Sequence, residues 1–169
     1  MSPSFATGAQ PSTSDFEFVL PRFALKTADE TVTNSAVLQD DDQLQVAVDA
    51  NKTYRLSGFV RWTCASSTPD IQFAFSLPAG ASLSWWGAGP HTDLTAQNSN
   101  LSVYAPDDTG VVWYGTNNST TFPSAMIIAG LLIVGSTAGS LTLRWAQQTS
   151  NASGVTVKEK SYLELLRVA

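Results

Sequence analysis

The sequence has few charged residues, one histidine and one cysteine, and each shortage excludes a class of site. Only 14% of the 169 residues are charged, and the net charge is −5. A nucleic-acid-binding surface needs clustered Lys and Arg to release counterions from phosphates, so we expect no nucleic-acid partner. Cys64 has no second cysteine for an intrachain disulfide, and a single histidine cannot supply a common zinc site. We therefore predict no metal and no cofactor.

Long hydrophobic runs are also missing. The most apolar stretch is 125–134, and a membrane-spanning helix needs roughly 20 residues. We therefore expect no insertion into a membrane. Residues 1–15 lack the basic and apolar regions of a secretory signal, so we expect no export by that route.

What the sequence does contain is a series of short alternating segments separated by turn residues. Leu44, Val46 and Val48 alternate with more polar neighbours, which is the period of a half-buried strand. Clusters of Gly, Pro, Asn, Asp and Ser separate this segment from similar ones along the chain. Many short strands with frequent turns predict an all-β, jelly-roll-like sandwich over residues 21–169.

Residues 1–20 differ from the rest because they are mostly small and polar and include prolines. This composition predicts a flexible N-terminal arm. The arm is a candidate docking segment that adds a strand to the open sheet edge of a larger particle, with Phe5, Phe16 and Phe18 as anchors. The alternative is a mobile terminus without a binding role.

The apolar stretch 125–134 predicts a core strand, and we expect it to form a hairpin with a second strand at about 139–146. A strand that is apolar on both faces must be covered on both faces. One face of an antiparallel sandwich sheet usually meets solvent, so we predict that another copy of the chain covers it. The alternative is that one monomer core takes all these residues. The predicted interface residues are Ile127, Ile128, Leu131, Leu132 and Trp145.

Catalytic and metal-binding candidates are weak. His91 could form a triad with Asp93 and a serine, but the sequence has no nucleophile elbow, so we predict no catalytic residue and no enzyme. The run Asp40–Asp42 offers oxygen ligands for Ca²⁺. Consecutive residues of an extended segment point in opposite directions, however. We therefore predict that this run is a solvated turn that protects an edge strand.

The segment around "SWWGAGPH" is the best candidate for a ligand or partner surface. Adjacent residues of a strand point to opposite faces, so we predict that one of Trp85 and Trp86 is in the core and the other is more exposed. An exposed tryptophan near His91 could stack on a sugar ring or pack on a protein. The alternative is that both tryptophans are buried.

Three segments carry a resemblance to a known family. They read "ALKTADETVTNSAVLQDDDQLQVAVDANKTYRLSGFVRW", "DIQFAFSLPAGASLSWWG" and "LLIVGSTAGSLTLRWAQQTSNASGVTVKEKSYLELLRVA". Together they resemble a domain of structural proteins of actinobacterial tailed phages, namely head-decoration, head-fibre and minor tail proteins. The resemblance covers roughly residues 24–169 and is weaker over 87–124. It implies a virion protein with a jelly-roll-like sandwich that forms a trimer, in the manner of tumour-necrosis-factor-like folds.

The function expected from these features is structural. We expect a head-decoration or head-fibre protein, located in the virion and assembled in the host cytoplasm, because only a short arm precedes the domain here. Its expected partners are two further copies of itself, the major capsid protein and other virion proteins. The alternative is a minor tail protein that binds a receptor, such as a host-surface glycan. A cell-wall hydrolase that depends on His91 is a remote third hypothesis.

Overall fold

The computed structural model describes residues 20–92 and 100–169, which form twelve β-strands. Within these ranges no helix is long and apolar enough to cross a membrane. The strands are Arg22–Leu25 (β1), Glu30–Val32 (β2), Gln39–Val48 (β3), Thr53–Cys64 (β4), Ile71–Ser76 (β5), Ser82–Pro90 (β6), Leu101–Tyr104 (β7), Val112–Tyr114 (β8), Ser119–Ile133 (β9), Gly139–Gln147 (β10), Val155–Val157 (β11) and Tyr162–Arg167 (β12).

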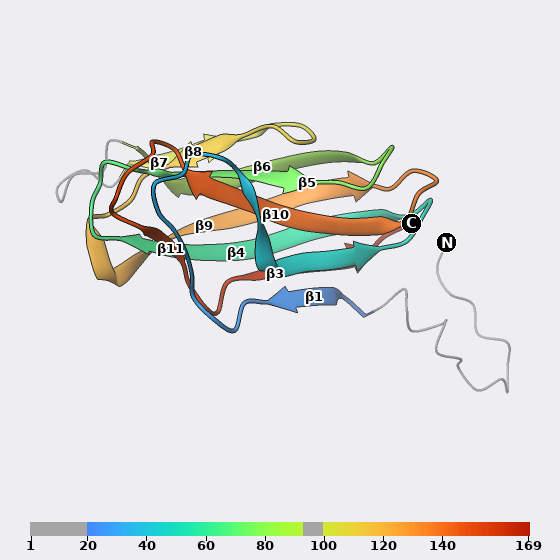
Figure 1. The fold of residues 1–169 in the computed structure, drawn as a ribbon. Coiled ribbons are helices and arrows are strands. Elements are labelled where there is room, and N and C mark those ends of the chain that lie inside the picture. Colours follow the sequence, from blue (N-terminus) through green and yellow to red (C-terminus); the bar gives the residue numbers. More distant parts are fainter. Residues whose placement is uncertain (1–19, 93–99) are drawn as a thin grey trace, which may run out of the picture.

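The strands form two antiparallel sheets. The larger sheet has eight strands, and six of them follow the order β1-β12-β4-β9-β6-β7. Strands β2 and β11 extend this sheet, because β11 pairs with both β2 and β4. The smaller sheet has the order β3-β10-β5-β8. Figure 1 shows β3 and β10 of the smaller sheet crossing in front of β4 and β9 of the larger one. The prediction of an all-β sandwich is confirmed.

The core lies between the two sheets and is rich in aromatic side chains. Trp85 of β6 packs edge-on against Phe75 of β5, with ring centroids 4.9 Å apart. Trp62 of β4 makes a similar contact with Phe73 of β5 at 5.3 Å. All four side chains are buried. These contacts join a strand of the larger sheet to a strand of the smaller one, so they hold the layers together.

The predicted hairpin between the apolar strand and its successor is wrong. Strand β9 lies in the larger sheet and β10 in the smaller one, so the connection between them crosses from one layer to the other. The reason is that β9 pairs along both edges, with β4 on one side and β6 on the other. No free edge remains for β10. The connection is instead fixed to the β3–β4 turn, where Asn51 N–H donates to the Gly135 carbonyl at 2.8 Å.

Gly130 interrupts the apolar strand because the neighbouring strand approaches it closely. Gly130 pairs with Trp85 across the sheet. A Cβ atom at position 130 would lie 2.7 Å from the Ser84 carbonyl oxygen and 2.8 Å from Trp85 Cβ. These distances are shorter than ordinary contacts between heavy atoms. A glycine at this position therefore lets β6 and β9 pair with Trp85 directed into the core.

Candidate functional site

The outer face of the larger sheet carries a continuous apolar surface. Alternate residues of β4, β6, β9 and β12 point into the sandwich, and the residues between them point outward. Many of the outward positions carry large apolar side chains, although Arg55, Arg61 and Glu164 also point outward. We call the following set the outer apolar face: Phe23, Leu25, Phe59, Trp86, Leu101, Val103, Ile127, Leu131, Ile133 and Tyr162.

One row of side chains crosses six strands of this sheet without a charged residue. Neighbours in the row are direct cross-strand partners, which brings their side chains into contact range. At a strand spacing of about 4.8 Å, the row is about 24 Å long. In order of pairing it consists of Leu25, Tyr162, Phe59, Ile127, Ala88 and Val103.

Large parts of this face are open to solvent in the single chain. Ile127 is 57% exposed and Val103 is 62% exposed. The aromatic residues at the β1 end of this face pack against one another. The rings of Phe23 and Tyr162 stack with their centroids 5.3 Å apart, and the ring centroids of Tyr162 and Phe59 are 6.3 Å apart. A surface with this many exposed large apolar residues is typical of a protein–protein contact.

The structure divides the five residues predicted at a subunit interface. Ile127 and Leu131 belong to the outer apolar face. Ile128, Leu132 and Trp145 are 1% exposed or less and belong to the core of the single chain. Their place at an interface is therefore corrected. Strand alternation separates Ile127 from Ile128 and Leu131 from Leu132, and Trp145 is on the inner face of β10 in the other sheet.

The two adjacent tryptophans also point to opposite faces, as predicted. Trp85 is in the core against Phe75. Trp86 is 41% exposed and lies on the outer apolar face beside Ala129 of β9. His91 comes directly after β6, and its backbone N–H donates to the Asn100 carbonyl at 2.9 Å. Of the predicted ligand surface, Trp86 is therefore the ring that could stack on a partner.

A small pocket borders the outer apolar face. It has a volume of about 280 Å³ and lies between Leu131 and Ile133 of β9 and the loop that contains Asp107 and Asp108. The Leu83 N–H donates to Asp108 Oδ1 at 2.8 Å, which fixes this loop to β6. Pockets that enclose a small ligand are usually larger than about 300 Å³. The volume of this depression is therefore at the lower end of the range for small-molecule sites.

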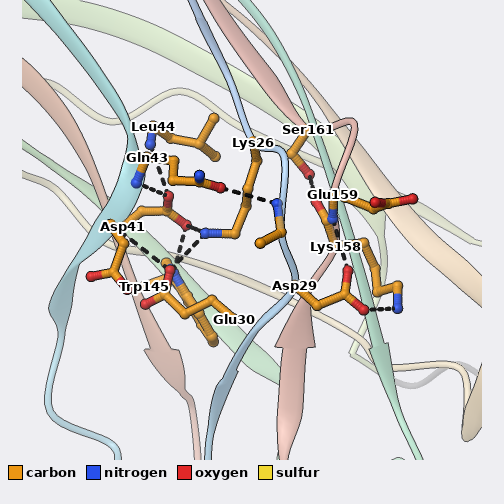
Figure 2. Close-up of polar contacts among 12 residues, drawn as sticks. Lys26, Asp29, Glu30, Asp41, Gln43, Leu44, Trp145, Lys158, Glu159 and Ser161 are labelled. Carbon is orange, nitrogen blue, oxygen red and sulfur yellow. Dashed lines mark hydrogen bonds and ion pairs between the residues drawn. The ribbon is translucent and has the colours of Figure 1, made fainter.

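The predicted solvated turn at Asp40–Asp42 is wrong. These residues belong to β3, and Asp41 is buried. Asp41 Oδ2 accepts hydrogen bonds from Lys26 Nζ at 2.8 Å and from Trp145 Nε1 at 3.1 Å (Figure 2). These two donors explain how a carboxylate can be buried here. Among the described residues, no group of three or more His, Cys, Asp and Glu is arranged to hold a metal ion.

Sequence reasoning did not identify Lys26 at all. Its side chain is 1% exposed and forms ion pairs with Asp41 and Glu30. The available signal was weak, because a lysine after a short strand is usually solvated.

Cys64 is also buried, and burial raises the pKa of its thiol, so it is not activated as a nucleophile. The arm residues Phe5, Phe16 and Phe18 lie outside the described residues.

Comparisons with known proteins give only distant structural similarities. No protein-family model and no curated protein matches the sequence. A xylan-binding domain from Paenibacillus barcinonensis is similar in structure, with 12% identity over 89% of this chain and 95% of that domain, at a TM-score of 0.30. The VP2 protein of an infectious bursal disease virus subviral particle shares 14% identity over 88% of this chain, at a TM-score of 0.23. This chain spans only 42% of VP2. Similarities at these scores say nothing about what this chain binds.

Proposed function

We propose that this protein is a structural component of a tailed-phage virion, without enzymatic activity, and that it packs against other subunits through the outer apolar face. The observation that carries the proposal is the exposed apolar row across six strands. Folding alone gives no reason for such a surface, because the core is already formed on the other side of the sheet. The resemblance to structural proteins of actinobacterial phages supports the virion role.

The first partner in this proposal is another copy of the chain, within a homotrimer. The chain has a net charge of −5, yet the row that centres on Ile127 and Phe59 contains no charged side chain. A surface of this kind excludes water best when its partner is also apolar. In a trimer, the same face of each of the three copies would meet the other two around the threefold axis and supply that complement. The major capsid protein or another virion protein is then contacted by a different part of the trimer.

Within the virion, we propose a place on the head, as a decoration or head-fibre protein. Immunogold electron microscopy tests this, with antibodies against the purified chain and virions of the phage that encodes it. Gold over the heads is the expected result. Gold at the tail tip would replace the head role with that of a minor tail protein. Virions that carry no gold, although the same serum detects the chain in infected cells, would contradict the virion role.

A glycan-binding role in the tail is the second candidate, and exposed Trp86 favours it. An aromatic ring on an accessible sheet surface can stack on a sugar. If the chain binds saccharides, Trp86→Ala should abolish binding to host cell-wall fragments, whereas Trp113→Ala should not. Trp113 is the matched control because it is 45% exposed and lies on β8, in the smaller sheet. Absence of binding by the wild-type chain would eliminate this candidate.

A further inference from the structure

A buried lysine lies between two carboxylates near the β1 edge of the sandwich. Lys26 follows β1 directly, Glu30 begins β2 and Asp41 is in β3. The Lys26 Nζ atom is 2.8 Å from Asp41 Oδ2 and 2.6 Å from Glu30 Oε2 (Figure 2). The Lys26 and Asp41 side chains are 1% and 0% exposed, and that of Glu30 is 12% exposed. The Lys26 amine is therefore in contact with two carboxyl groups, and all three side chains are largely shielded from water.

The backbone around Lys26 is fixed. Its N–H donates to the Ser161 carbonyl at 2.8 Å, and its own carbonyl accepts from Lys160 N–H at 2.7 Å. The amine therefore approaches Asp41 from a constrained position. Holding two reacting groups in this way removes much of the entropic cost of their reaction.

Asp41 is held even more completely. Its Oδ1 atom accepts two backbone hydrogen bonds, from Gln43 N–H at 2.9 Å and from Leu44 N–H at 2.8 Å. Its Oδ2 atom accepts from Trp145 Nε1 at 3.1 Å, in addition to Lys26. Two N–H groups directed at one oxygen are the arrangement that stabilises the oxyanion of a tetrahedral intermediate. The two oxygens of Asp41 are thus distinguished, because Oδ1 has the paired donors and Oδ2 faces the amine.

Glu30 is placed to exchange a proton with the Lys26 amine. Its Oε2 atom contacts Lys26 Nζ and also accepts from Asp42 N–H at 3.3 Å. Its Oε1 atom accepts from Gln39 Nε2 at 2.8 Å. The carboxylate is therefore held against the amine, in the position that a general base and acid requires.

We propose that Lys26 and Asp41 condense to form an isopeptide bond inside the folded chain. A proton passes from the Lys26 ammonium to Asp41 Oδ2, which leaves a neutral amine beside a carboxylic acid. The nitrogen lone pair then forms a bond to Asp41 Cγ, and Oδ1 becomes an oxyanion held by the N–H groups of Gln43 and Leu44. Glu30 takes a proton from the nitrogen and delivers it to Oδ2. The bond between Cγ and Oδ2 breaks, and Oδ2 leaves as water.

The reaction balances without any co-reactant. The ammonium and the carboxylate become one amide and one water molecule, and Glu30 returns to its initial state. Formation of the amide also eliminates two opposite charges from a buried site, where the desolvation of charged groups costs free energy. The new bond would fasten the end of β1, in the larger sheet, to β3 in the smaller sheet. It would close a loop between positions 26 and 41 that contains β2.

Mass spectrometry of the purified, denatured wild-type chain tests the proposal directly. The expected intact mass is lower than the sequence mass by one water molecule. Trypsin gives a sharper readout, because Lys26 is the only tryptic site between Arg22 and Lys52. The linked chain should yield one peptide, 23–52, that is uncut at Lys26. Cleavage after Glu30 should then open this peptide without separating its parts.

The controls separate the reaction from simple ion pairing. Glu30→Gln has nearly the same size but cannot carry the proton, so the folded variant should keep the full sequence mass and be cut at Lys26. An equally linked Glu30→Gln variant would overturn the role of Glu30. Lys158 and Asp29 form a more exposed ion pair nearby without this set of neighbours, and they should remain unlinked. Wild-type protein that keeps its full mass and is cut at Lys26 after prolonged incubation would overturn the proposal.

Discussion

The outer faces of the two sheets differ in their chemistry, although both sheets contribute to one core. On the smaller sheet, the residues that point away from the core are mostly polar, among them Gln45 of β3, Gln72 of β5 and Arg144 of β10. On the larger sheet many of the corresponding positions belong to the outer apolar face, although Arg55, Ser57 and Glu164 also point outward. The polar face is suited to contact with water, whereas the apolar face is suited to contact with protein.

This difference shows that two requirements act on one strand. In β9, residues such as Ile128 are needed for folding, because they fill the space between the sheets. Their neighbours, such as Ile127, are apolar for another reason, since folding of one chain leaves them exposed. Substitutions only one residue apart should therefore differ strongly in their effect on the stability of the single chain.

The largest effect is expected in a comparison of Ile128→Ala with Ile127→Ala. Removing the buried side chain should lower the free energy of unfolding by about 2–5 kcal/mol, because a cavity remains. Removing the exposed one should change it by less than about 0.5 kcal/mol. Urea unfolding of both variants, at protein concentrations too low for assembly, measures the difference. Similar losses for the two variants would show that the two faces of β9 are not distinct.

An intermediate effect is expected for Gly130→Ala. The added Cβ would press against the Ser84 carbonyl oxygen and Trp85 Cβ, so β6 must shift, at a cost of about 1–3 kcal/mol. Ala129→Ser, one residue away on the outer side, is the control and should be nearly neutral. Thermal unfolding of the three proteins provides the measurement. A variant as stable as the wild type would mean that Trp85 does not require this close approach.

The smallest effect concerns an ion pair between the edges of the two sheets. The Arg22 guanidinium beside Asp49 holds the pKa of that carboxyl below its usual range. A lowered pKa stabilises the fold above the unfolded value of about 3.9, and this contribution is lost as the pH falls through the folded value. Because both side chains are partly exposed, Asp49→Asn should cost only about 0.5 kcal/mol at neutral pH. The difference from wild type should vanish in acid. A difference in stability that persists in acid would mean that Asp49 acts through packing and not through its charge.

Much of the fold could be predicted from the sequence, because alternation and turn residues are local signals. They located the strand of Leu44, Val46 and Val48 and the opposite orientations of Trp85 and Trp86. The pairing of β9 and β10 with different partners could not be predicted in this way, since it depends on which strand edges are free. The buried contact of Lys26 with Asp41 could not be predicted either, because charged residues are rarely buried and their partners here come from distant parts of the chain.

If the outer apolar face is an interface between subunits, the molar mass of the protein in solution must depend on it. Light scattering after size-exclusion chromatography should give wild-type chain the mass of a trimer. Ile127→Lys should give a folded monomer, because a charge then lies at the centre of the apolar row. Val37→Lys, at an exposed valine outside this face, should remain assembled. A monomeric wild-type chain, or an Ile127→Lys variant with undiminished mass, would contradict the account.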